Sequence, residues 1–107
     1  MSAILTEQEF SRHLNTTFHT LLDDGPAVAL QLVLVKPFKH NAPEETGMEQ
    51  FSAFFIGGLG APLPQRTYRL QHEEMGEFDI FLVPISQKEE GYRYEAVFNY
   101  FINPQND

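Results

Sequence analysis

Two spacings of hydrophobic residues divide the chain. Near the start, the capping box Thr6-Glu7-Gln8-Glu9 precedes Phe10, His13 and Leu14, which lie at the spacing of one helical face. This pattern predicts a short helix over residues 7–14. From Thr16 onward, the apolar residues recur mainly at every second position, which is the period of a β-strand.

The two-residue period recurs in several segments between residues 16 and 101, which are separated by stretches rich in Gly, Pro and Asp. Both faces of the second segment are apolar, so we expect that strand to be covered on both sides. Pro84 cannot donate a hydrogen bond to a neighbouring strand, so we expect its strand to end there or to lie at an edge. The expected strands are 16–22, 27–35, 51–56, 67–72, 77–83 and 92–101.

These elements predict a mainly β (α+β) fold. The connections are too short for helical crossovers, so the strands should pair antiparallel. About six antiparallel strands around an aromatic core would form a small barrel or a compact sandwich, with the N-terminal helix plugging an open end or covering a face. The 107 residues suit a single domain, 1–107, with a frayed tail over 103–107.

Composition and charge narrow the class of protein. Fifteen acidic residues against seven basic ones give a formal net charge of -8, and the bases are scattered, which argues against a nucleic-acid partner. The longest apolar run is far shorter than a membrane span, and the N-terminus lacks the pattern of a signal peptide, so a cytoplasmic protein without a membrane partner is expected. The absence of cysteine excludes disulfides, thiolate catalysis and Cys-type zinc sites.

The sequence offers little catalytic chemistry. His13, His19, His40 and His72 show no metal-ligand spacing, and the best local cluster, His72-Glu73-Glu74, is more typical of a solvated acidic turn. The stretch Gly57-Gly58-Leu59-Gly60 lacks the Lys-Ser/Thr of a phosphate-binding loop. We therefore expect no catalytic residue, no cofactor and no metal.

Glu95 is the most notable acidic residue, because it lies in the middle of the last strand on the same face as Arg93. A cross-strand ion pair with Arg69 or Arg66 would satisfy it, and a ligand-binding carboxylate is the alternative. Tyrosines are also candidates, because a phenol hydroxyl requires water or a polar partner. The residues proposed for a pocket or an interaction surface are Tyr68, Arg69, Tyr92, Tyr94, Glu95 and Tyr100.

Several blocks of sequence occur in a distinctive order. They are Phe10-Ser11-Arg12-His13-Leu14, Phe51-Ser52-Ala53-Phe54-Phe55-Ile56-Gly57-Gly58, Gln65-Arg66-Thr67-Tyr68-Arg69-Leu70-Gln71-His72, Met75-Gly76, Phe81-Leu82-Val83-Pro84-Ile85 and the closing Tyr94-Glu95-Ala96-Val97-Phe98-Asn99. In these blocks the chain resembles a family of uncharacterised bacterial domains that are small and rich in β-strands. The resemblance implies no assigned activity. Some family members lie near genes for phage-tail-like proteins, which implies an accessory or assembly role.

Three functions remain open from the sequence. The first is a non-catalytic protein-interaction or assembly module whose partner is another protein or the chain itself. The second is a β-barrel that binds a small ligand in its aromatic interior. The third, ranked last, is a small enzyme that uses Glu95 or the His72 cluster.

Overall fold

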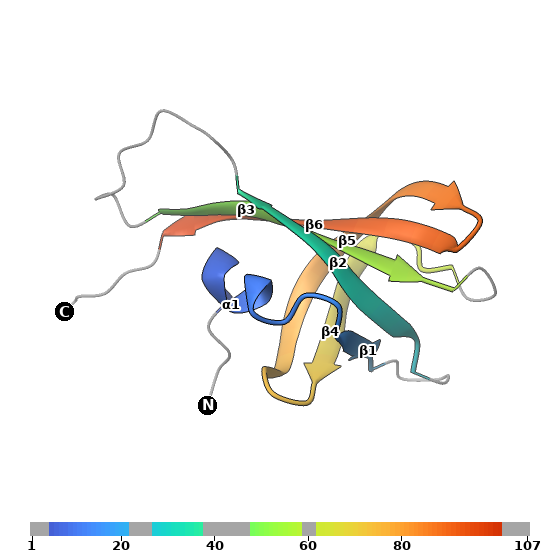
Figure 1. Cartoon of the computed structure of the whole chain (residues 1–107), viewed down its shortest axis with the longest axis horizontal. Coiled ribbons are helices and arrows are strands. Elements are labelled where there is room, and N and C mark those ends of the chain that lie inside the picture. Colours follow the sequence, from blue (N-terminus) through green and yellow to red (C-terminus); the bar gives the residue numbers. More distant parts are fainter. Residues whose placement is uncertain (1–4, 22–26, 38–47, 59–61, 102–107) are drawn as a thin grey trace.

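One closed sheet of six antiparallel strands makes up most of a computed structural model, which describes residues 5–21, 27–37, 48–58 and 62–101. The strand order is β1-β2-β3-β6-β5-β4, and β4 pairs with β1 to close the ring (Figure 1). The mainly β fold with one N-terminal helix is therefore confirmed. The elements are α1 (Glu7–Ser11), β1 (Thr17–Thr20), β2 (Ala29–Pro37), β3 (Met48–Gly57), β4 (Arg66–His72), β5 (Gly76–Lys88) and β6 (Gly91–Phe101).

Strand β5 changes its partner halfway along its length. Its residues from Gly76 to Leu82 pair with β4, and the pairs with β6 begin at Val83. The first half of β5 and the second half of β6 therefore separate, and the helix α1 lies at this end of the sheet (Figure 1).

Phe10 fills the space inside this end of the sheet. Its ring lies 6.2 Å from Phe18, 5.8 Å from Phe51, 5.9 Å from Phe78 and 5.2 Å from Phe98, measured between centroids. These partners come from β1, β3, β5 and β6, so one helical side chain joins four strands. The helix thus plugs an open end of the sheet, which was one of the two placements expected from the sequence.

The helix is shorter than predicted. Thr6 caps it as expected, with its Oγ1 accepting a hydrogen bond from the Glu9 backbone at 3.1 Å, but the helix ends at Ser11 instead of residue 14. Asn15 adopts a φ of 67°, and its backbone N–H donates to the Leu32 carbonyl at 2.7 Å. The contact with β2 therefore ends the helix at Ser11, although the apolar pattern continues to Leu14.

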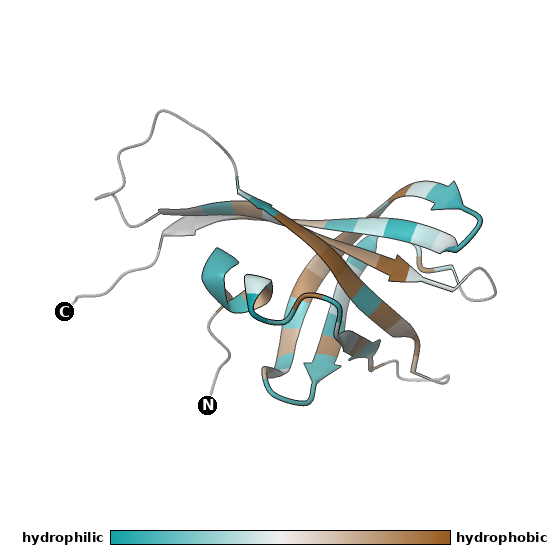
Figure 2. Ribbon diagram, in the orientation of Figure 1, coloured by the Kyte–Doolittle hydropathy of each residue, from teal (hydrophilic) through white to brown (hydrophobic). Residues whose placement is uncertain are grey.

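The prediction that the second strand is covered on both sides is wrong. Strand β2 buries Leu30 and Leu32 in the core, but Gln31 and Leu34 are exposed. A register shift between Leu32 and Leu34 reverses the inward-facing positions, so that Val35 packs against the core. Figure 2 shows that β2 is apolar over much of its length, although one of its two faces points outward.

Pro84 does not end its strand, but it lies beyond Leu82, the last residue of β5 that pairs with β4. Among the described residues, β5 therefore pairs with β6 alone at Pro84, so the expected edge position is confirmed. Strand β5 continues to Lys88, and its register against β6 shifts between Pro84 and Ser86. An irregularity of this kind tolerates a residue that cannot donate a hydrogen bond, because the regular ladder is already interrupted.

The predicted frayed tail, 103–107, lies outside the described residues. Within the described part of the chain, no helix has the length and apolar character needed to cross a membrane.

Candidate functional site

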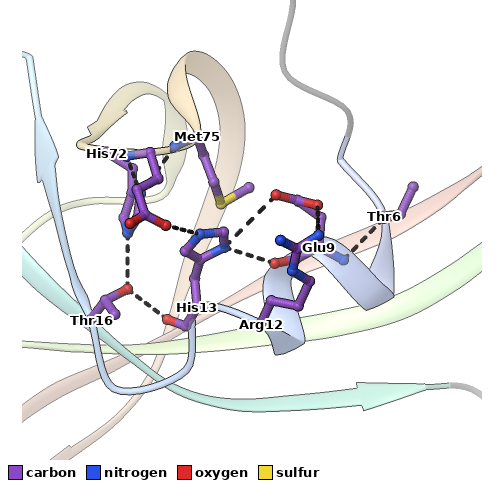
Figure 3. A network of polar contacts seen from close by, with 8 residues as sticks. Thr6, Glu9, Arg12, His13, Thr16, His72 and Met75 are labelled. Carbon is purple, nitrogen blue, oxygen red and sulfur yellow. Dashed lines mark hydrogen bonds and ion pairs between the residues drawn. The ribbon is translucent and has the colours of Figure 1, made fainter.

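Closure of the sheet brings two histidines together that are far apart in the sequence. His13 follows α1 and His72 is the last residue of β4, and their ring centroids lie 4.7 Å apart. Thr16, which contacts His72, and Glu74, which contacts His13, complete the group. Figure 3 shows the network around His13, Thr16 and His72 from close by. No sequence pattern indicated this contact, because it depends on the pairing of β1 with β4.

The hydrogen bonds assign a neutral state to His72. Its Nδ1 accepts hydrogen bonds from the backbone N–H groups of Glu74, at 3.0 Å, and Met75, at 3.1 Å. Its Nε2 therefore carries the proton and donates to Thr16 Oγ1 at 2.9 Å, and Thr16 donates in turn to the His13 carbonyl at 2.6 Å. Burial lowers the pKa of His72, and the neighbouring His13 lowers it further.

His13 has the opposite environment. Its Nδ1 lies 2.9 Å from the Glu9 carbonyl oxygen, and its Nε2 lies 2.9 Å from Glu74 Oε1. Both neighbours are acceptors, so both ring nitrogens donate and the imidazolium is favoured. The hydrogen bond to Glu9 is the main cause that raises the pKa of His13; Glu74 adds to it and burial opposes it.

An open pocket of about 870 Å³ lies beside these rings, and its lining is polar. All four ring nitrogens of His13 and His72 are already engaged within the protein, so none is free to act on a substrate. The described residues also contain no group of three or more His, Cys, Asp or Glu that could hold a metal ion. The network thus ties α1 to the β4–β5 turn.

A second feature is an apolar area on the outside of β2, β3, β6 and β5, which we call the outer face. The strand register aligns Leu34, Phe54, Glu95 and Val83 in one row across these four strands. Its large apolar side chains are exposed or half-buried, with Val97 55% and Phe81 48% exposed. The apolar members of the outer face are Leu34, Phe54, Ile56, Phe81, Val83, Ile85 and Val97.

The outer surface of β4 and the start of β5 is charged. Arg69 Nε lies 3.0 Å from Asp79 Oδ1, and its Nη1 lies 3.9 Å from Glu77 Oε1. The ring of strands therefore has a polar side and an apolar side.

Two charged residues lie within the outer face. Glu95 accepts a hydrogen bond from the hydroxyl of the buried Ser52 at 2.7 Å. Arg93 is half-buried, and its Nε is buried with no hydrogen-bond partner among the described residues. The predicted ion pair of Glu95 with Arg69 or Arg66 is wrong, because both of those arginines lie on β4, which is not a neighbour of β6 in the ring.

The six residues proposed from the sequence do not gather at one site. Tyr68 and Tyr94 point into the core, where burial raises the pKa of both phenols. The Tyr68 hydroxyl donates to the Pro64 carbonyl, and the Tyr94 hydroxyl accepts from the backbone of Leu63.

Tyr92 is half-buried against the core, and the side chain of Tyr100 lies outside the described residues. Arg69 belongs to the charged side and Glu95 to the outer face. In the segments 27–35 and 51–56, both alternating sets of positions are largely apolar, so both faces of each strand are apolar. This was the sequence signal that could have revealed the outer face.

The fold and these two features define a small closed antiparallel β-sheet domain with a helical plug and an apolar outer face. The chain belongs to the family described as "Domain of unknown function (DUF6916)", which matches residues 5–98. No curated protein and no solved structure matches the chain.

Proposed function

We propose that this domain is a non-catalytic protein-interaction module that binds its partner through the outer face. The observation that supports the proposal is the exposure of large apolar side chains from adjacent strands on one side of the ring, including Leu34, Ile85 and Val97. Contiguous exposed apolar surface of this kind is typical of protein–protein contacts, because burying it removes apolar area from water.

The interior favours this function over a ligand-binding barrel. Aromatic rings from α1 and the strands fill it and contact one another, as Phe51 and Phe98 do at 4.6 Å between centroids. The histidine network likewise favours a structural role, since its ring nitrogens are all occupied. Neither feature offers a reacting group to a substrate.

The absence of cysteine allows a direct test. Val97→Cys and Ile85→Cys variants, labelled with a photo-activated cross-linker on the thiol, are exposed to extract from the cells that make the protein. Discrete covalent protein adducts are expected from these two positions. A matched variant, Glu73→Cys, places the same label on the exposed turn between β4 and β5 and should give none.

The position dependence decides the result. Adducts that form equally from all three positions, or from none of them, would overturn the proposed function. The melting temperature of each unlabelled variant, compared with that of the wild-type protein, serves as the check that the fold is retained.

A second candidate function is the binding of a small polar molecule in the pocket beside the histidine network. The observation that favours it is the pocket volume of about 870 Å³, with Arg12, His19 and Gln71 in its lining. A thermal-shift screen of metabolites on the wild-type protein and on Gln71→Ala tests it. A stabilising compound that loses its effect in the variant is expected, and a screen without any such compound contradicts this function.

A further inference from the structure

We propose that the occupant of the outer face is a second copy of this chain, related by a two-fold axis that passes close to Tyr94 of β6. In this arrangement Arg93 of each copy faces Glu95 of the other. The inference rests on the proposed function, because it names the partner of the same surface.

The charges of the outer face support a second copy. Arg93 Nε is buried and lacks a partner among the described residues, although a guanidinium has five N–H donors. Glu95 receives a hydrogen bond from Ser52, and a carboxylate has about four acceptor sites. A partner surface that offers one carboxylate and one guanidinium satisfies both groups, and an identical copy offers these two groups.

The spacing along β6 agrees with two-fold symmetry. Arg93 and Glu95 are two residues apart and both point outward, whereas the side chain of Tyr94 between them points into the core. In a two-fold contact, if residue i meets residue j, then j meets i. An axis that passes between the two side chains therefore forms both ion pairs at once.

Apolar residues lie beside this charged pair on β3, β5 and β6, and Ser86 of β5 is a polar neighbour opposite Arg93. Across the β3–β6 ladder, Phe54 lies opposite Glu95 and Ile56 lies opposite Arg93, and Val97 follows on β6. On the other side, Val83 of β5 lies opposite Glu95. Packing two such surfaces together would exclude water from the ion pairs and strengthen them.

The net charge of the chain also limits how two copies can meet. Each copy carries a formal charge of -8, so most relative orientations are repulsive. Along the outward positions of β6 from Arg93 to Val97 the charges cancel, with one arginine and one glutamate. The outer face therefore allows two acidic molecules to approach each other.

Light scattering after size-exclusion chromatography tests the inference on the full chain. The wild-type protein is expected at twice the 12.3 kDa chain mass. Arg93→Glu and Glu95→Arg should each be monomeric, because each variant places like charges opposite one another. An equimolar mixture of the two variants should return to the dimer mass, since the two acidic groups of the first variant would then face the two basic groups of the second.

Two charge changes away from the outer face serve as controls. Arg12→Glu and Glu73→Arg change the net charge by the same amounts as Arg93→Glu and Glu95→Arg, but at exposed positions outside the outer face. Both controls should leave the dimer intact. The mixing experiment also guards against misfolding, because two unfolded variants could not restore a dimer with each other.

Two results would overturn the inference. One is a wild-type protein that stays monomeric at every concentration; the other is a mixture of the two variants that fails to form the heterodimer. If the chain is monomeric while Val97→Cys still cross-links to other proteins, only the second copy is excluded and the proposed function stands. If the chain is monomeric and Val97→Cys does not cross-link to other proteins, both the second copy and the proposed function are contradicted.

Discussion

Replacing Phe10 by alanine would test how much the helical plug contributes to the stability of the domain. The Phe10 side chain is fully buried, and it contacts rings from four strands. The helix that carries it has five residues, which is too short to be stable alone. Its position therefore depends on this packing.

The structure allows the size of the effect to be worked out. Burying about 150–250 Å² of an aromatic side chain at about 25 cal/mol per Å² is worth about 4–6 kcal/mol as an upper bound. Measured Phe→Ala changes in cores cost about 3–5 kcal/mol, and we expect Phe10→Ala to fall in this range. That is a large part of the total stability of a domain of this size, about 5–15 kcal/mol.

Urea unfolding followed by circular dichroism measures the free energy of unfolding of Phe10→Ala and of a control, Gln8→Ala. Gln8 lies on the exposed side of the same helix, so its replacement should change the free energy by less than about 0.5 kcal/mol. A loss below about 1 kcal/mol for Phe10→Ala would refute the reasoning. It would mean that the sheet closes without the helix.

Two further predictions concern a backbone position and the histidine network. Gly91 has a φ of 148°, and a Cβ there would collide with the backbone carbonyl oxygen of Gly57. Gly91→Ala should therefore lower the free energy of unfolding by about 2 kcal/mol or more, whereas Gly58→Ala, which meets open space, should change it by less than about 0.5 kcal/mol. NMR titration should place the pKa of His13 above 6.5 and that of His72 below 6.5. The stabilisation from His13 is then complete below pH 6.5 and is lost as the pH rises through its folded pKa, whereas that from His72 is present above pH 6.5 and is lost as the pH falls through its folded pKa. Urea unfolding that gives equal effects for the two alanine variants, or a titration with the two pKa values in the reverse order, would contradict these predictions.

Local patterns predicted the helix and the strands well, because the cap that starts the helix and the alternation that gives a strand its buried face are both local features. The cap of Thr6 on Glu9 is a contact between residues three apart, and the alternation of Tyr68 and Leu70 with polar neighbours fixes one buried face of β4. These signals do not depend on which strand lies next door.

The candidate sites could be predicted only in part. Glu95 and Arg93 were placed on one face of the last strand from parity alone, and the structure agrees. Their surroundings could not be predicted, because the neighbour of β6 on each side depends on the strand order. The expected ion pair with β4 failed for this reason.

The sequence by itself determined a capped N-terminal helix, strands with a buried parity and the absence of cysteine chemistry. The tertiary structure alone decided that β1 pairs with β4, which joins His13 to His72, and that β5 leaves β4 for β6. It also decided which face points outward from the closed ring in those strands that have two apolar faces. The physical reason is that a strand's own residues specify its two faces, whereas the partner, the register and the side of the sheet that faces inward come from contacts between distant segments.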